Sequence, residues 1–370
     1  MAKPKYYSLD KILTYNADYN IIYGERSNGK TTAVLLHGLE RYVRSAYTDQ
    51  LAIVRRWDED FKGSKASQLF SAIVNLGYVS KLTSGMFNNV VYRAGKWYLC
   101  TFDENAKLVD IATEPFAFAF SLTSEEHYKS ISFPHIKTVL FDEFITRSYY
   151  LPDEFIKFQN LLSTIIRLND DVRIFMCGNT VNQFCPYFEE MGLNKIKYQK
   201  IGTIDIYQYG ENKLTVAVEY SDFNGSKKAS NKYFAFDNPK LNMIKDGSWE
   251  IDIYPHLPVK YYPTEIIYHY FICFFDTILQ CEIIFSRELQ TSFTYIHRKT
   301  TDIRPDDTSL IFSQVIRPER KYRLFLHKPT DKISARIWDY FVKNKVFYQD
   351  NQIGEIVRNF IMQQKKAVTL

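Results

Sequence analysis

The sequence predicts an α/β protein with a mostly parallel amino-terminal sheet, followed by a smaller α+β region. Three observations support this fold class. In the first half, short apolar runs alternate with amphipathic segments, which is typical of parallel strands connected by helices. A glycine-rich stretch at 24–31 joins the first apolar run to the first amphipathic segment. After about Gly202, alternating polar and apolar residues predominate, which favours antiparallel strands.

The elements follow from these patterns in chain order. Buried strands are expected at four apolar runs, 19–23, 50–57, 138–141 and 172–177. Helical spacing of apolar residues predicts helices at 31–44, 58–80 and 152–168. Alternation over 87–122 predicts hairpins, with turns at Ala94-Gly95 and near Glu104-Asn105. Later strands are expected at 204–209, 214–218, 266–275, 280–286, 292–297 and 322–327, and later helices at 331–344 and 351–366.

A chain of 370 residues is long enough for two domains, each with its own core. We expect a phosphate-binding α/β domain at 1–203 and a second domain at 246–370. Between them, 204–245 is interpreted as a connector, because it contains a polar, turn-rich patch at 224–228 and the first of several prolines spread over 239–263.

The composition is that of an ordinary globular protein, with 46% hydrophobic and 24% charged residues. The formal net charge of +5 is compatible with a polyanionic partner but is weaker than in obligate nucleic-acid binders. The five cysteines have no metal-ligand spacing, so reduced thiols are expected. The most apolar segment, 266–275, is too short to cross a bilayer. We therefore expect a cytoplasmic protein with no membrane segment.

Residues 24–31 match the phosphate-binding pattern G-x-x-x-x-G-K-[ST], and they read Gly24-Glu25-Arg26-Ser27-Asn28-Gly29-Lys30-Thr31. The two glycines allow successive N–H groups to curl around a phosphate. Lys30 would meet the β- and γ-phosphates, the Thr31 hydroxyl would be a ligand of Mg²⁺, and Thr32 would follow in the binding segment. The strand before this loop and the helix after it provide the context that the motif needs. The sequence thus predicts binding of ATP or another nucleoside triphosphate with Mg²⁺.

A second motif, an apolar strand that runs into two carboxylates, provides the other half of such a site. It reads Val139-Leu140-Phe141-Asp142-Glu143. Asp142 would hold Mg²⁺ through its water shell, and Glu143 would orient and deprotonate the attacking water. Asn179 follows the next strand, and its amide would report hydrolysis if that strand lies between the loop strand and the acidic strand. The alternative for Asn179 is a strand-ending turn.

Several basic residues are candidates for a role at the γ-phosphate. Arg147 would act from a neighbouring subunit, because guanidinium is always charged and binds phosphate through two N–H groups. Arg167 and Lys107 are weaker candidates for the same role. Arg55 and Arg56 would either touch nucleotide or cap their strand, and the sequence does not choose between these.

Together these motifs resemble those of the genome-packaging ATPases (encapsidation proteins) of small short-tailed phages, compact relatives of large terminase subunits. The resemblance covers residues 15–195. It implies a P-loop NTPase of the additional-strand, catalytic-Glu type. It also implies a homo-oligomeric ring of five subunits on the capsid portal protein that couples ATP hydrolysis to translocation of double-stranded DNA. The location would be the host cytoplasm and, transiently, the procapsid portal. The need for a packaging RNA or protein adaptor stays open.

In such relatives the carboxyl-terminal region resembles an RNase H-like nuclease. The strand that ends at Asp276 and the turn after it are compatible with the opening hairpin of that fold. Two-metal cleavage needs at least three converging carboxylates, and the candidates are Asp276, Asp302, Asp306 and Asp307. The last three lie in a polar stretch typical of a solvated loop, so we expect no nuclease activity. Basic clusters at 317–323 and 365–366 would be solvated or would contact phosphates.

Two other functions share the phosphate loop. A small-molecule or nucleotide kinase would need an acceptor pocket and does not require a glutamate after the Mg²⁺ aspartate. A non-motor nucleotide switch or scaffold would hydrolyse slowly and ignore DNA. No Asn-Lys-x-Asp motif occurs, which disfavours a GTP switch.

Overall fold

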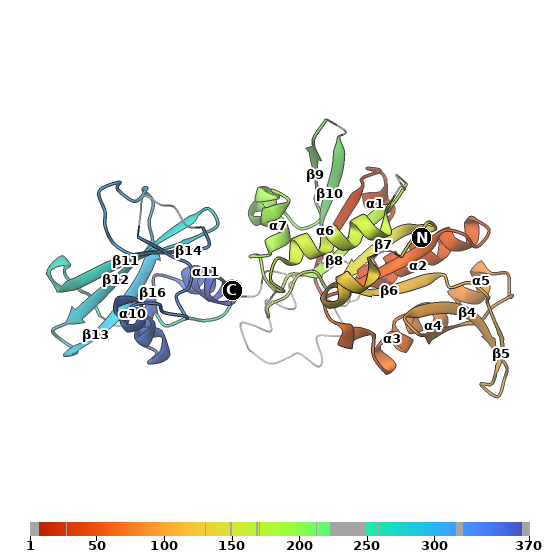
Figure 1. Cartoon of the computed structure of the whole chain (residues 1–370), viewed down its shortest axis with the longest axis horizontal. Helices are drawn as coiled ribbons and strands as arrows, with labels where there is room; N and C mark the ends of the chain where they lie inside the picture. The colour runs from red at the N-terminus through yellow and green to blue at the C-terminus, as the bar shows by residue number, and fades with distance from the viewer. Residues whose placement is uncertain are drawn as a thin grey trace. The chain divides into compact units, whose positions relative to one another are not determined.

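The computed structural model (Figure 1) describes residues 7–364 except 27, 130, 149, 168, 170, 212, 223–248, 250, 258 and 316–320. The described residues form two compact units. The first lies within 1–147 and 153–250, and the second lies within 148–152 and 251–370. Within the described residues, no helix is both long and apolar enough to cross a membrane. Each unit is built around one sheet.

The sheet of the first unit has a parallel centre, as the sequence predicts. Its strand order is β3-β4-β6-β2-β7-β8-β1-β10-β9, and β5 pairs with β4. The parallel strands are β6 (Ala117–Ser121), β2 (Gln50–Arg55), β7 (Ile136–Asp142), β8 (Arg173–Asn179), β1 (Tyr19–Gly24) and β10 (Leu214–Ser221). Strand β8 therefore lies between β1 and β7, which is the condition that the sequence sets for a role of Asn179. The carboxyl ends of these three strands lie side by side at the same end of the sheet.

Helices cover both faces of this parallel centre (Figure 1). On one face lies α2 (Lys30–Arg44), whose Val34, Leu35 and Leu39 belong to one core cluster with residues of β1, β2, β7 and β8. On the other face, α6 (Glu154–Ile165) and α7 (Pro186–Glu190) contribute Phe158 and Tyr187, which both contact Phe141 of β7. Burial on both faces explains why these strands are continuous apolar runs rather than alternating ones.

The predicted helix at 58–80 is wrong in its continuity. The segment forms four short helices, η1 (Asp58–Phe61), α3 (Ser64–Gln68), α4 (Ser71–Asn75) and α5 (Tyr78–Leu82). Gly63 and Gly77 have φ of 59° and 73°, values in the left-handed region that a continuing α-helix does not contain. The apolar residues of this segment are spaced as in a helix because several of them pack into the core, Phe70 and Ile73 among them.

The edges of the first sheet are antiparallel. One edge contains β3 (Asn89–Arg93), β4 (Lys96–Phe102) and β5 (Leu108–Ile111). The connections between them, at 94–95 and 103–107, include the turns predicted at Ala94-Gly95 and near Glu104-Asn105. The other edge is the hairpin of β9 (Ile204–Tyr209) and β10, and β10 pairs with β1. The sequence assigned these two strands to a connector, whereas the structure includes them in the first sheet. The turn-rich patch at 224–228 lies outside the described residues.

The second unit has a six-stranded mixed sheet in the order β15-β14-β11-β12-β13-β16. Its strands are β11 (Ile266–Phe274), β12 (Thr277–Ser286), β13 (Thr291–Arg298), β14 (Ile311–Ser313), β15 (Tyr322–Arg323) and β16 (Val346–Tyr348), and its helices are α10 (Lys332–Val342) and α11 (Asn351–Met362). The strand predicted at 322–327 is thus only two residues long. The described residues contain four further short helices, α1 (Asp10–Leu13), η2 (Leu122–Tyr128), η3 (Asn194–Tyr198) and η4 (Pro263–Glu265).

A buried ion pair fixes the end of β2 against the start of α6. Arg56 donates from Nε and Nη2 to the two carboxylate oxygens of Glu154, both at 2.8 Å, and these side chains are 6% and 1% exposed. The Tyr187 hydroxyl also donates to Glu154, at 3.0 Å. Arg56 donates further to the main-chain oxygens of Glu143 and Phe144, so the pair also holds the segment after the acidic strand.

We expect Glu154→Gln to lower the free energy of unfolding by about 3 kcal/mol, because it leaves a buried guanidinium without its counter-charge. Urea unfolding followed by intrinsic fluorescence measures the change. Glu59→Gln is the control, because the Glu59–Lys62 pair is exposed and its loss should have no measurable effect. Equal stabilities of the two variants would contradict the assigned role of the buried pair.

Candidate functional site

The loop at 24–31 closes on itself through backbone conformations that glycine favours. Gly29 has a φ of 90° and immediately precedes α2. Gly24, at the end of β1, lies so close to β10 that a Cβ atom there would be 2.9 Å from the main-chain oxygen of Ser221. The side chain of Asn28 is buried and donates to the Ser221 hydroxyl at 3.1 Å. Both ends of the loop are therefore held against the strands beside it.

Lys30 is buried among uncharged oxygen atoms. Its Nζ donates to the main-chain oxygen of Glu25 at 2.6 Å, to Asn28 Oδ1 at 3.1 Å and to Asn179 Oδ1 at 3.3 Å. Burial lowers the pKa of the Lys30 ammonium to about 8, although Cys177, Asp142 and Glu25 oppose this shift. A buried cation whose hydrogen-bond partners are all neutral is suited to an anionic ligand.

The loop and the acidic strand converge although they are far apart in the sequence. The Thr31 hydroxyl donates to Asp142 Oδ1 at 2.7 Å. Arg55 donates from Nη2 to Asp142 Oδ2 at 2.5 Å, and its Nη1 lies 3.7 Å from Glu143 Oε2. The Asp142 side chain is 4% exposed, whereas the Glu143 side chain is 63% exposed. Asp142 is thus held in place by Thr31 and Arg55, whereas Glu143 reaches solvent.

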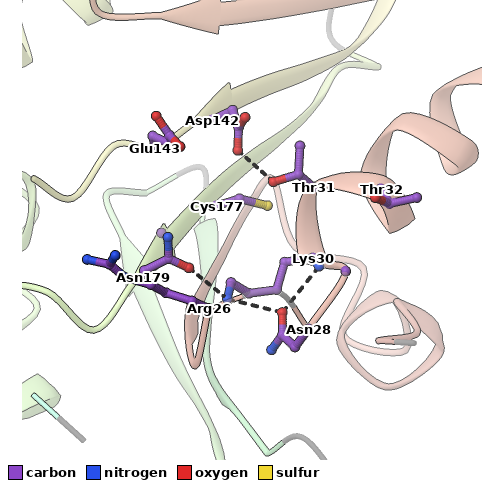
Figure 2. Close-up of a pocket in the computed structure, with 11 residues that line it drawn as sticks. Arg26, Asn28, Lys30, Thr31, Thr32, Asp142, Glu143, Cys177 and Asn179 are labelled. Atoms are coloured by element: carbon purple, nitrogen blue, oxygen red, sulfur yellow. Dashed lines mark hydrogen bonds between the residues drawn. The ribbon is translucent and has the colours of Figure 1, made fainter. Parts of the chain in front are cut away.

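These groups surround a cavity of about 400 Å³ (Figure 2). Its lining residues come from the loop, α2 and the ends of β7 and β8: Arg26, Asn28, Gly29, Lys30, Thr31, Thr32, Asp142, Glu143, Cys177, Gly178 and Asn179. In Figure 2, Glu143, Asn179 and Arg26 lie on the side away from Thr31 and Thr32. The register of the sheet explains this convergence, because Gly24 is opposite Asn179 and Asp142 is opposite Cys177.

The structure brings together most, but not all, of the residues that the sequence singled out. Gly24 and Glu25 hold the loop and do not line the cavity, and Ser27 lies outside the described residues. Arg147 lines a neighbouring cavity of the same chain and donates to the Val181 main-chain oxygen at 3.3 Å. Arg167 and Lys107 line neither cavity and are exposed.

The carboxylates proposed for a nuclease centre do not converge. Asp307 accepts from the Ser309 main-chain N–H at 2.9 Å and lies 3.3 Å from His269 Nε2. Among the residues that the structure describes, no group of three or more histidine, cysteine or acidic side chains could hold a metal ion. Lys365 and Lys366 lie outside the described residues, and so do Arg317 and Arg320 of the basic cluster at 317–323.

The sequence gives no definite role to three residues at the site. It left two roles open for Arg55, and the structure pairs that side chain with both acids. Cys177 lines the cavity, and burial raises the pKa of its thiol, so the neutral form is favoured. Ser221 holds the loop from a strand that the sequence assigned to a connector. No local pattern identifies these residues, because each acts through strand pairing across the sheet.

The donor set fits a magnesium–triphosphate group. The Thr31 hydroxyl and the Asp142 carboxylate have oxygen atoms 2.7 Å apart, and oxygen atoms are the ligands that Mg²⁺ prefers, so this pair would suit it. The loop N–H groups and Lys30 would hold phosphate oxygens. Glu143 is positioned to accept a proton at the cavity rim. The arrangement can therefore support hydrolysis of a phosphoanhydride.

Comparisons with known proteins point to one family. The family model of the Podovirus DNA encapsidation protein (Gp16) matches residues 1–200. The DNA packaging protein of Bacillus phage phi29 is 27% identical over 191 residues, which cover 51% of this chain and 50% of that relative. The chain thus matches about half the length of this curated relative.

Two solved structures show the fold of the chain. One, the Phi-28 gp11 DNA packaging motor, has a TM-score of 0.54 and 15% identity and covers 100% of both chains. The other, the bacteriophage Phi-29 viral genome packaging motor assembly, has a TM-score of 0.55 and 17% identity and covers 96% of this chain and 97% of that one. The likeness therefore includes the second unit as well as the first.

We expect the affinity for a Mg²⁺-bound, non-hydrolysable triphosphate analogue to fall as the pH rises above 8. Bound phosphate favours the charged form of Lys30. Above pH 8 the free protein has lost this proton, so binding must take one up, and the affinity falls by up to about tenfold per pH unit. Calorimetric titrations between pH 7 and 9.5 measure it. Lys30→Arg keeps its charge throughout this range. An equally steep fall in that variant would contradict the assignment to Lys30.

Proposed function

Because the chain belongs to the Podovirus DNA encapsidation protein (Gp16) family, we propose that it is an ATPase that drives packaging of double-stranded viral DNA into a preformed capsid. The observation that carries this proposal is the convergence of Lys30 and Thr31 with Asp142 and Glu143 around one cavity. These residues come from segments more than a hundred positions apart, and a phosphate-binding loop alone would not require the second acid.

The proposed reaction is hydrolysis of ATP. Asp142 and Thr31 would hold Mg²⁺, which neutralises charge on the β- and γ-phosphates when it is bound. Lys30 would contact the same phosphates and stabilise the charge that develops on the leaving group. Glu143 would orient a water molecule and take one of its protons, a role that its exposed carboxylate at the cavity rim supports.

The strand order supports the additional-strand, catalytic-Glu type of P-loop NTPase, because β8 lies between β1 and β7. Asn179 at the end of β8 accepts a hydrogen bond from Lys30, so it is suited to sensing the γ-phosphate. For the second unit we propose an RNase H-like fold without nuclease activity. The antiparallel hairpin of β11 and β12, with Asp276 in its turn, supports the fold.

We propose that the working form is a ring, with the portal protein and DNA as partners and five as the number of subunits. Residues that complete a neighbour's site must then reach out of their own subunit. Arg147 lines a cavity of its own chain, which supports a role in cis. Arg167 follows α6 and lies near Asn169, which donates to the main-chain oxygen of Ile136 at the start of β7, at the end of the strand away from the phosphate loop. Lys107 lies in the turn between β4 and β5. Both are exposed, which supports a role in trans.

ATP turnover should rise with added double-stranded DNA and with protein concentration, and Glu143→Gln should abolish it while ATP still binds. Removing the base leaves the phosphate contacts in place, so the expected loss is at least about a hundredfold in kcat. Phosphate release and nucleotide binding are measured on the same purified protein. Glu190→Gln, an exposed change on α7, is the matched control and should keep full turnover.

Turnover that ignores both DNA and concentration would count against a motor. Transfer of labelled γ-phosphate to an acceptor other than water would indicate a kinase instead. Unreduced turnover in Glu143→Gln would refute the assignment of Glu143 as the general base.

A mixing experiment tests the roles in trans. Arg167→Ala and Glu143→Gln should each be inactive in the ring, but a mixture should recover activity. An Arg167→Ala subunit receives an intact arginine wherever its neighbour is Glu143→Gln, which is about a quarter of the interfaces in a random ring. The same reasoning applies to Lys107→Ala. Lys30→Ala mixed with Glu143→Gln should stay inactive, because both changes damage a site in cis. No recovery with either surface variant would contradict the assignment.

A further inference from the structure

Strand β10 reaches the phosphate loop at Ser221. In the parallel pairing of β1 with β10, Ser221 lies opposite Gly24, the first glycine of the loop. A Cβ atom on residue 24 would clash with the Ser221 hydroxyl oxygen, so glycine at this position leaves room for the hydroxyl. The Ser221 residue is buried. The first glycine of the motif therefore permits a buried contact as well as the curl of the loop.

The Ser221 hydroxyl determines how the side-chain amide of Asn28 is oriented. This hydroxyl donates its single hydrogen to the Tyr23 main-chain oxygen at 3.0 Å. Toward Asn28 it can then only accept, so the amide atom 3.1 Å away must be the Nδ2 donor. Because the donor and the acceptor of an amide lie at opposite ends, Asn28 Oδ1 is turned toward Lys30.

The amide oxygen of Asn28 holds Lys30 at two points. It accepts from Lys30 Nζ at 3.1 Å and from the Lys30 main-chain N–H at 3.3 Å. The Nζ group also donates to the Glu25 main-chain oxygen at 2.6 Å and to Asn179 Oδ1 at 3.3 Å (Figure 2 shows the side-chain contacts). The bond to Asn179 is the longest of the three, so a phosphate oxygen replaces it most readily. The two bonds to the loop then keep the ammonium in place.

The main chain of Asn28 is held from another direction. The Tyr7 N–H donates to the Asn28 main-chain oxygen at 2.9 Å, and the Tyr7 hydroxyl donates to Glu219 at 2.6 Å. Glu219 is buried and lies two residues before Ser221 on β10. With its main chain held in this way, Asn28 can still rotate its side-chain amide, and the contact with Ser221 prevents that rotation.

We propose that Ser221 is a positioning residue for triphosphate binding. It orients the Asn28 amide, and this amide holds the Lys30 ammonium ready for the β- and γ-phosphates. A lysine side chain loses conformational freedom when it binds phosphate, and a side chain that is already held loses less. The contact therefore raises the affinity for nucleotides that have a β-phosphate. The inference rests on the proposed function, which makes a triphosphate the ligand of this cavity.

Calorimetric titration of the full chain with Mg²⁺ and a non-hydrolysable ATP analogue tests this role. Ser221→Ala removes the acceptor for the Asn28 amide and should weaken analogue binding by about threefold to tenfold. AMP lacks the phosphates that Lys30 would contact, so its affinity should be the same in wild type and in Ser221→Ala. Ser221→Cys is a second variant that keeps a side chain of similar shape, and it should resemble Ser221→Ala because a thiol is a weak acceptor.

A double-mutant cycle measures whether Ser221 acts through Asn28. Asn28→Ala should weaken analogue binding by itself, and Ser221→Ala should cause no further loss in that background. If Ser221 contributed only to the general stability of the sheet, Ser221→Ala would lower the affinity by the same factor in both backgrounds.

Thr83→Val is the matched control, because it removes a buried hydroxyl from the same unit. That hydroxyl donates to the Val79 main-chain oxygen at 2.9 Å and accepts from the Phe87 N–H at 3.1 Å. Thr83 does not line the triphosphate cavity, so Thr83→Val should bind the analogue as tightly as wild type.

Equal affinities of wild type and Ser221→Ala for the analogue would overturn the proposal. So would a loss of affinity that AMP shows to the same extent, or one that persists in the Asn28→Ala background. These outcomes leave the proposed function in place as long as wild type binds the analogue more tightly than AMP. A wild-type chain that binds both equally would instead refute the triphosphate site on which the inference rests.

Discussion

The pairing of β8 with both β1 and β7 is the constraint on which the rest of the site depends. Its register sets Gly24 opposite Asn179 and Asp142 opposite Cys177, so the phosphate loop and the acidic strand end at the same height with one strand between them. That spacing lets the Thr31 hydroxyl reach Asp142 at 2.7 Å. A shift of two residues in either pairing would move the acid by about 7 Å and break this contact.

Local sequence was sufficient to predict the parts of the site whose chemistry lies within a short segment. The loop needs two glycines, a lysine and a threonine at fixed spacing, and 24–31 has them. The acidic strand needs apolar residues on both faces and an acid at its end, and 139–143 has these as well. Buried parallel strands were predictable for the same reason, because both of their faces pack against helices and leave an unbroken apolar run.

Features that depend on pairing between distant segments were not predictable in this way. From the sequence alone, an arginine at the end of β2 could either cap the strand or touch the nucleotide. The register with β7 places Arg55 beside Asp142. The sequence of β9 and β10 indicates a connector, and only the pairing of β10 with β1 shows that this hairpin belongs to the first sheet. The segment at 58–80 shows the converse error. Its apolar residues do face the core, but two glycines with positive φ divide the helix that their spacing indicates.

The distribution of charge supports the proposal that metal and phosphate bind together in this site. Arg55 lies against both acids, so their charge is partly compensated within the protein, whereas the Lys30 ammonium has only neutral acceptors. The first cavity thus has a cationic side at the loop and a compensated acidic side at the end of β7. A bare triphosphate would satisfy the first and repel the second. A triphosphate that carries a divalent cation would complement both, because the cation would add positive charge beside Asp142 and Glu143, which Arg55 compensates only in part.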